Sequence, residues 1–161
     1  MAIEAPISKF AKTNIKIYIA ACLAAAVIFA YDGYLSKYKW SGRYSFYQEH
    51  VLDNDGIPNA AMNFNTKSPP VFLGAAVLFT VYLFVIKKNK LIADENELVF
   101  SNKKRIAYDS IQKINKTYFD KKGYFVITYN NESGKQVQRK ISDRKYDKLA
   151  PILDHLVAKI T

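Results

Sequence analysis

The stretch that decides the fold is residues 71–86, VFLGAAVLFTVYLFVI, which contains no charged side chain. The residues that flank it are Pro69 and Pro70 before it, and Lys87, Lys88 and Lys90 after it. A proline at a helix start loses no hydrogen bond, because the first N–H groups have no intrahelical partner. The run has no polar face, which disfavours the alternative of a buried helix in a soluble protein. It approaches the lower length limit for crossing a bilayer, and we predict a transmembrane helix over residues 70–86.

A second apolar run precedes it at residues 15–35, IKIYIAACLAAAVIFAYDGYL. Its charged residues, Lys16 and Asp32, lie near its ends, and the stretch spans roughly 30 Å as a helix. A cleaved signal peptide is the alternative, because the segment has a basic start and small residues in its middle. However, it is longer than a usual signal core and ends in tyrosines, which favours an uncleaved transmembrane helix over residues 15–35.

Small residues on both runs predict how the two helices meet. Small side chains allow backbones to approach closely where dispersion drives helix association in lipid. The predicted packing face comprises Ala21, Ala24, Ala25, Gly74 and Ala75. These residues favour a two-helix hairpin, and the same faces would equally suit packing on a larger membrane partner.

The basic residues that flank the two runs predict the orientation of the hairpin. Lysines cluster before the first run and at Lys87, Lys88 and Lys90 after the second, whereas those of the loop are spread over a longer stretch. Basic clusters remain cytoplasmic. We therefore expect an integral protein of the inner (cytoplasmic) membrane with both termini cytoplasmic, residues 1–14 forming a cytoplasmic N-terminal segment. Lys87, Lys88 and Lys90 form a predicted membrane-surface cluster.

Residues 36–69 then form an extracytoplasmic loop that is too aromatic for an inert linker. We predict a short amphipathic helix over residues 44–52 and irregular structure over residues 53–70, which are rich in Asn, Asp, Gly and Pro. Trp40, Tyr44 and Tyr47 are the predicted contacts for a partner on the outer side.

A metal site in this loop is disfavoured. Residues 53–56, DNDG, are similar to the start of a calcium loop, but placing Gly56 at the sixth position puts Val51 and Met62 where ligands are needed. A single histidine, His50, among surface acids is no stronger a signal. We expect neither a metal nor a cofactor.

Residues 87–161 read as a small α+β domain. Two short apolar runs, residues 91–92 and 98–100, flank a hairpin turn at residues 94–96. Further strands are expected at residues 105–108, 117–119, 124–129 and 135–141. Asp109 and Ser110 suggest a helical turn through Ile114. The alternation of side-chain types over residues 136–141 is typical of a strand with one face exposed to solvent.

The C-terminal residues predict one amphipathic helix. Apolar side chains recur at three- and four-residue steps from Tyr146 to Ile160, after Ser142 as a cap. Pro151 indicates a kink or a restart. His155 falls on the opposite side from the apolar stripe and is expected at the surface.

The order of about six short strands and one helix resembles the bacterial pleckstrin-homology-like (PH-like) domains that adjoin membrane spans. The resemblance lies in LIADENEL at residues 91–98, IAYDSI at residues 106–111, the strand of residues 124–129 and SDRKY at residues 142–146. It implies a bent antiparallel sheet or barrel closed by the C-terminal helix, and binding of phosphoinositide or peptide. Lipid-binding members carry basic residues in the first hairpin loop, whereas Asp94 and Glu95 here would repel phosphate.

The charge balance of residues 87–161 limits the classes of partner that we expect. Residues 87–161 carry 17 basic and 9 acidic side chains, against 7 and 5 in residues 1–86. Such a balance suits an anionic leaflet or an acidic protein, although solvated turns are the simpler interpretation of most basic pairs. No recognised nucleic-acid motif accompanies the charge, and nucleophile–base pairs and glycine-rich phosphate loops are lacking.

The predicted function is therefore a non-catalytic, membrane-anchored interaction module, such as an accessory subunit of a larger membrane assembly. Its expected partners are the lipid bilayer and a membrane or cytoplasmic protein or a second copy of the chain, with no nucleic acid. The alternative is an anionic-lipid-sensing membrane protein that acts through its basic PH-like domain.

Overall fold

The computed structural model describes residues 2–101 and 104–160, and the chain divides into two compact units. The helical unit comprises residues 14–83. The sheet unit combines the N-terminal residues up to 13 with residues 84 onward. The N-terminal and C-terminal residues thus belong to the sheet unit, and the helical unit is inserted between them in the sequence.

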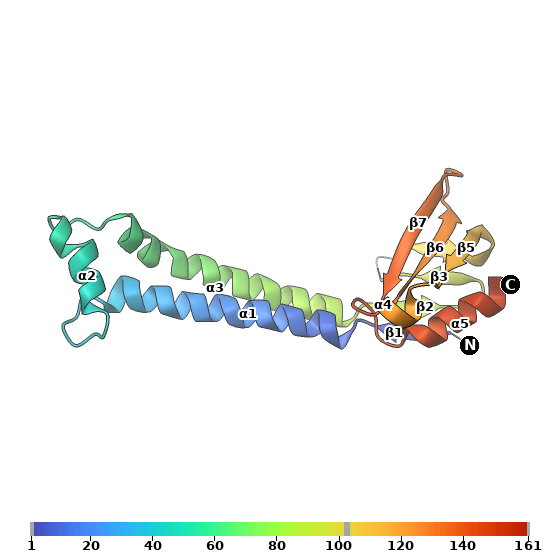
Figure 1. Ribbon diagram of the computed structural model, residues 1–161, viewed down its shortest axis with the longest axis horizontal. Helices are drawn as coiled ribbons and strands as arrows, with labels where there is room; N and C mark the ends of the chain where they lie inside the picture. Colours follow the sequence, from blue (N-terminus) through green and yellow to red (C-terminus); the bar gives the residue numbers. More distant parts are fainter. Residues whose placement is uncertain (1, 102–103, 161) are drawn as a thin grey trace. The chain divides into compact units, whose positions relative to one another are not determined.

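Two long helices run antiparallel and side by side in the helical unit (Figure 1): α1, Lys9–Ala30, and α3, Ala60–Lys87. Both are long and apolar enough to cross a membrane. They meet through Ala26 and Ala76, which are buried, and through the rings of Phe29 and Phe72, whose centroids lie 5.5 Å apart. Much of the remaining apolar surface is exposed.

The second helix begins ten residues earlier than the sequence predicts, so Pro69 and Pro70 lie inside α3 rather than at its start. Two prolines remove the N–H groups that would bond the carbonyls of Asn65 and Thr66, four residues back. The end of α1 compensates for this loss. There the chain forms a π-helical turn, η1 (Tyr31–Leu35), and the Tyr34 hydroxyl donates to the Thr66 carbonyl at 2.6 Å.

Gly33 in the same π-helical turn brings the two backbones together. A Cβ at Gly33 would lie 2.5 Å from the Asn65 carbonyl oxygen, closer than real contacts allow. The glycine therefore permits a close approach to the carbonyl that Pro69 leaves without its usual partner.

The connecting segment contains the short helix α2, Tyr44–His50, within the predicted range, followed by a 3-10 turn at Leu52–Asn54. Irregular structure ends at Asn59, whose side-chain oxygen accepts from the backbone N–H groups of Ala61 and Met62, both at 3.1 Å. This is a helix N-cap, so the prediction of irregular structure to residue 70 is wrong after Asn59.

The sheet unit contains two antiparallel sheets within the described residues (Figure 1). One has the order β1-β2-β3-β4 and the other β5-β6-β7. Their bounds are β1 Ile3–Pro6, β2 Lys90–Ala93, β3 Glu97–Val99, β4 Arg105–Ala107, β5 Ile111–Asn115, β6 Tyr124–Asn130 and β7 Gln136–Ser142. The hairpin turn at residues 94–96 and the strand over residues 136–141 are confirmed.

Strand β1 corrects the predicted domain boundary. Residues 3–6 were expected to lie in a separate segment before the first span, but they pair antiparallel with β2 from Ile3↔Ala93 to Pro6↔Lys90. Ala5 is fully buried, and Ile7 bridges to Tyr146. The N-terminal residues are therefore part of the sheet domain.

Two local predictions in the second sheet are also wrong. Residues 111–115 form strand β5 and not a helical turn, because the turn after β4 is confined to η3, Tyr108–Ser110. Phe119 begins the short helix α4, Phe119–Lys122, where a strand was expected. The turn ends at Gly123, whose positive φ of 63° suits glycine.

Helix α5, Leu149–Ile160, begins seven residues after the predicted cap at Ser142, so Pro151 lies in its first turn. The helix packs on β1, β2 and η3. Its buried residues Ile152, Leu153 and Leu156 join the core of the two sheets, which includes Leu91, Leu98, Ile106, Phe125, Ile127 and Ile141.

Candidate functional site

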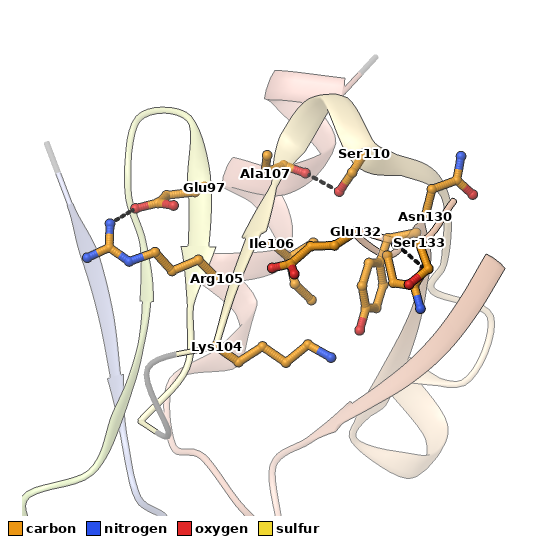
Figure 2. A pocket seen from close by; sticks show the side chains of 11 residues that line it. Glu97, Lys104, Arg105, Ile106, Ala107, Ser110, Asn130, Glu132 and Ser133 are labelled. Atoms are coloured by element: carbon orange, nitrogen blue, oxygen red, sulfur yellow. Dashed lines mark hydrogen bonds and ion pairs between the residues drawn. The ribbon is translucent and has the colours of Figure 1, made fainter. Parts of the chain in front are cut away.

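The sheet unit holds an open cleft of about 800 Å³ between β4 and the turn that joins β6 to β7 (Figure 2). One wall is formed by residues 104–107 and Ser110, and the other by residues 129–133. Glu97 lies at the margin next to β4. The cleft is lined by nearly equal shares of polar and apolar groups and is open to solvent.

The backbone of β4 turns hydrogen-bonding groups toward this cleft. The Phe100 N–H donates to the Lys104 carbonyl at 2.8 Å, and the Tyr108 N–H donates to the Asn96 carbonyl at 3.0 Å. In an antiparallel ladder the bonded residues alternate, so Lys104, Ile106 and Tyr108 bond toward β3. The main-chain groups of Arg105 and Ala107 therefore face away from β3, along the edge of the sheet.

The charged side chains of the cleft differ in how they are held. Figure 2 shows Arg105 turned away from the cleft toward Glu97, and its Nη1 lies 2.8 Å from the Glu97 carboxylate. Lys104 and Glu132 point into the cleft (Figure 2). The Lys104 ammonium lies 5.3 Å from the centre of the Tyr129 ring, a cation–π contact.

Tyr108 anchors the inner end of β4. Its hydroxyl donates to the Asp94 carbonyl at 2.7 Å, and burial raises the pKa of Tyr108 to about 12, with smaller contributions from the charges of Asp94 and Glu97. The phenol therefore stays protonated at neutral pH and holds the β2–β3 turn. Its ring also contacts His155, with centroids 6.0 Å apart.

His155 is half-buried against this tyrosine, and its Nε2 lies 3.1 Å from the Asp94 carbonyl. His155 is thus a partly exposed surface residue, as predicted, with Tyr108 and Asp94 as its neighbours. His50, in the helical unit, has its Nδ1 2.9 Å from the Asn59 side-chain nitrogen. Within residues 2–101 and 104–160, no three His, Cys, Asp or Glu side chains are grouped to hold a metal ion.

The predicted basic cluster lies where α3 ends. Lys87 and Lys88 are exposed, and the Lys87 ammonium lies 5.1 Å from the centre of the Phe84 ring. Lys90 forms an ion pair with Glu4 of the neighbouring strand β1. The sequence does not reveal this pairing, because Glu4 and Lys90 are far apart in the chain.

The predicted packing face of the two helices is displaced by about one residue. Ala25 and Ala75 are half-buried, whereas Ala21, Ala24 and Gly74 are exposed. The small residues that are buried are Ala26 and Ala76, the neighbours of Ala25 and Ala75. Ala21, Ala24 and Gly74 leave a surface of small residues on the outside of the hairpin.

The predicted loop contacts are arranged in two groups. Trp40 is 70 % exposed and stacks on Tyr38 with centroids 5.6 Å apart. Tyr44 and Tyr47 are half-buried, with centroids 6.3 Å apart. The solvent-accessible aromatic of this set is therefore Trp40.

Sequence reasoning missed an ion pair at the same end of the hairpin. Arg43 donates through Nε and Nη2 to the two carboxylate oxygens of Asp32, each at 2.9 Å. Asp32 is buried, and its hydrogen bond and charge raise the pKa of the Arg43 guanidinium. The available signal was Asp32 itself, since an acid in an apolar run requires a partner.

The cleft beside β4 thus offers an open strand edge together with a lysine, a carboxylate and an aromatic ring. Comparison with protein-family models, with curated proteins and with solved structures finds no match to this chain. The chemistry of the site itself must therefore indicate its use.

Proposed function

We propose that this chain is a non-catalytic, membrane-anchored interaction module, whose helices α1 and α3 cross the bilayer and whose sheet unit binds a partner protein. The observation that carries the proposal is the pairing of β1 with β2. These strands precede α1 and follow α3. Because paired strands must lie on the same side of a membrane, the chain between them crosses it an even number of times.

The surface of the two helices supports insertion into lipid. Side chains that are large, apolar and exposed occur along both, among them Val27, Ile28, Val71, Val77, Leu78 and Val81. Water-soluble proteins rarely leave so large a contiguous apolar area uncovered. The basic residues at the ends of the helices support a location in the inner membrane with the sheet unit cytoplasmic.

The architecture of the sheet unit is compatible with the PH-like resemblance. Two antiparallel sheets and a C-terminal helix that packs on β1 and β2 are the parts that such a domain requires. In this proposal β1 is the first strand of the domain, and the membrane hairpin is inserted between its first and second strands.

The cleft supports recognition of an extended peptide. An exposed strand edge presents alternating donors and acceptors that a second extended chain can satisfy. The edge of β4 presents the main-chain groups of Arg105 and the N–H of Ala107, whose carbonyl already accepts from the Ser110 hydroxyl at 2.7 Å. Lys104, Glu132 and Tyr129 supply side-chain contacts. We therefore propose that a segment of a partner protein adds to β4, as expected of an accessory subunit in a membrane assembly.

A substitution that removes one main-chain N–H tests this mode of binding. Ala107 has φ −64° and ψ 141°, values that proline adopts without strain. Ala107→Pro removes the N–H on the open edge and leaves the bonds to β3 intact. Loss of one main-chain hydrogen bond should weaken partner binding about 5- to 10-fold, whereas the control Ala107→Val, which keeps the N–H, should bind normally.

Partner binding is measured by photocrosslinking from position 133, on the cleft wall opposite β4, in intact cells, followed by native sizing in mild detergent. A specific adduct with the wild-type edge, weakened by Ala107→Pro only, supports the proposal. A lone monomer without any adduct contradicts the interaction role. A product that dissolves during a carbonate wash without detergent contradicts the membrane anchor.

A further inference from the structure

The sheet unit gathers its basic loops around the point where the two helices leave it. The first turn of α1 and the last turn of α3 belong to this unit. The Ser8 N–H donates to the Lys145 carbonyl at 3.0 Å, and the Ser8 hydroxyl donates to the Arg144 carbonyl at 2.6 Å. The Ile7 N–H donates to the Asn89 carbonyl at 3.2 Å. Segments far apart in the chain are thus fixed beside one another.

Helix α4 reaches the same place. Phe10, in the first turn of α1, lines a shallow hollow with Lys121, Lys122 and Arg144. The Asp143 N–H donates to the Gly123 carbonyl at 2.8 Å, which ties the end of α4 to the segment before α5. The Arg144 guanidinium lies 5.8 Å from the centre of the Phe10 ring.

We call this region the exit surface. It comprises Lys9, Lys87, Lys88, Lys121, Lys122, Arg144 and Lys145, with the half-exposed Phe10 among them. The acidic residues beside these seven basic ones are Asp120, Asp143 and Asp147. Asp147 is partly engaged, because its carboxylate accepts from the Lys9 N–H at 3.0 Å. The exit surface therefore carries a net positive charge.

The opposite end of the strands is acidic. Strands β2 and β6 both run from the exit surface, at Lys90 and Tyr124, to turns at their far ends. Those turns and their neighbours carry Asp94, Glu95, Glu97, Asp109 and Glu132, against two basic residues, Lys135 and the Arg105 that pairs with Glu97. Seven residues of β6 separate the two ends by about 20 Å. The sheet unit is thus polarised, with its positive end at the helix exits.

We propose that the exit surface docks on anionic lipid headgroups, an inference that rests on the membrane anchorage proposed above. Phe10 precedes the apolar part of α1 by one to two turns, and Lys87 directly follows the apolar part of α3. Both residues must then lie at headgroup depth. Lys121, Lys122, Arg144 and Lys145 are held beside them, where each contributes attraction to a negative leaflet.

Docking of this kind selects one orientation of the sheet unit over the bilayer. It holds α4 and residues 142–148 against the headgroups and turns the acidic end, with Glu132 of the cleft, away from them. Anionic lipid is favoured over an acidic protein segment because the proposed membrane helices hold this surface beside the leaflet, whereas a soluble partner must reach it by diffusion.

The experiment uses the full chain in nanodiscs of phosphatidylcholine, with and without about 30 % of the anionic lipid phosphatidylglycerol. Hydrogen exchange is followed in residues 118–123 and 142–148 and, for comparison, in residues 131–134. We expect slower exchange at the first two segments in anionic discs only, reversal at high salt, and no change at residues 131–134.

A matched pair of variants isolates the exit surface. Lys121→Gln with Lys122→Gln should lower the ratio of docked to undocked domain roughly 30-fold, from two lysines near a charged leaflet. Lys113→Gln with Lys135→Gln removes the same charge elsewhere and should leave docking unchanged. Circular dichroism confirms that both variants fold.

Three results would overturn the inference: equal protection in neutral and anionic discs, protection in neither, or protection by an acidic polypeptide but not by anionic lipid. Each of these requires a chain that has inserted into the discs. Failure to insert would instead contradict the proposed membrane anchor, so the two failures are distinguishable.

Discussion

Phe125 in β6 and Leu78 in α3 are both large apolar side chains, yet the first is fully buried and the second is 72 % exposed. The contrast extends to the two units. Apolar side chains of the sheet unit converge between the sheets and α5, whereas those of the helical unit point outward along most of α1 and α3. The sheet unit supplies its own apolar environment, and in the membrane anchor proposed above lipid would supply that of the helical unit. The exposure of apolar side chains thus distinguishes a unit that folds around its own core from one that leaves its apolar side chains uncovered.

The largest test of this contrast compares truncations at the two positions. Phe125→Ala removes a fully buried ring that contacts Phe119 edge-on at 5.9 Å, and it should lower the free energy of unfolding of the sheet unit by about 3–5 kcal/mol. Leu78→Ala removes an exposed side chain and should change the stability in detergent by less than about 0.5 kcal/mol. Denaturant unfolding followed by near-UV circular dichroism measures both. Similar losses at the two positions would mean that Leu78 is packed within the protein.

Two glycines sharpen the contrast inside the helical unit. Gly33→Ala places a methyl group 2.5 Å from the Asn65 carbonyl oxygen, which should destabilise helix packing by about 2 kcal/mol. Gly74→Ala meets nothing within 4 Å among the described residues and should be neutral or stabilising by up to about 1 kcal/mol. Thermal unfolding in detergent distinguishes them. Equal effects of the two substitutions would contradict the close approach of η1 and α3.

The parts of the fold that depend on local pattern were predictable. Apolar runs predicted both long helices, and the alternation over residues 136–141 predicted β7. Strand β1 was not predictable, because its four residues include a proline and its partner residues in β2 lie 84 to 90 positions later in the chain. Long-range pairing of this kind leaves no periodic signal in the sequence.

The early start of α3 escaped prediction for a different reason. Residues 60–70 contain Asn, Thr, Ser and two prolines, whose intrinsic preferences disfavour a helix. Tertiary contacts from Gly33 and Tyr34 compensate for the prolines, and a reading of local preferences cannot include them. The exit surface is similar: its basic pairs are visible in the sequence, but only the fold brings Lys121, Arg144 and Lys9 together.

The ion pair between Asp32 and Arg43 tests whether the end of the hairpin is fixed by polar contacts. Asp32→Asn removes the charge that binds the guanidinium through two hydrogen bonds and should lower stability by about 1–2 kcal/mol, since Arg43 remains half exposed. Asp53→Asn, an exposed acid of the same loop, is the matched control and should have little effect. Loop proteolysis and thermal unfolding both report the difference. An unchanged protease pattern in Asp32→Asn would show that the aromatic contacts suffice.

The smallest expected effect lies in the sheet unit and depends on pH. The pKa of Tyr108 is raised to about 12 by burial, against about 10 in the unfolded chain. The unfolded state therefore loses this proton first, and the stabilising contribution is complete below pH 10 and is lost as the pH rises toward 12. Tyr108→Phe should lower the stability of the sheet unit by about 1 kcal/mol at pH 8, through loss of the bond to Asp94.

Tyr108→Phe should also reduce the loss of unfolding free energy between pH 10 and 12, compared with the wild type. Other tyrosines and lysines titrate in both proteins, so the difference between the two curves isolates Tyr108. The measurement is denaturant unfolding at pH 8, 10, 11 and 12. Parallel curves would mean that the phenol is as accessible as those of the surface tyrosines, and the β2–β3 turn would then lack the anchor that positions β4 beside the cleft.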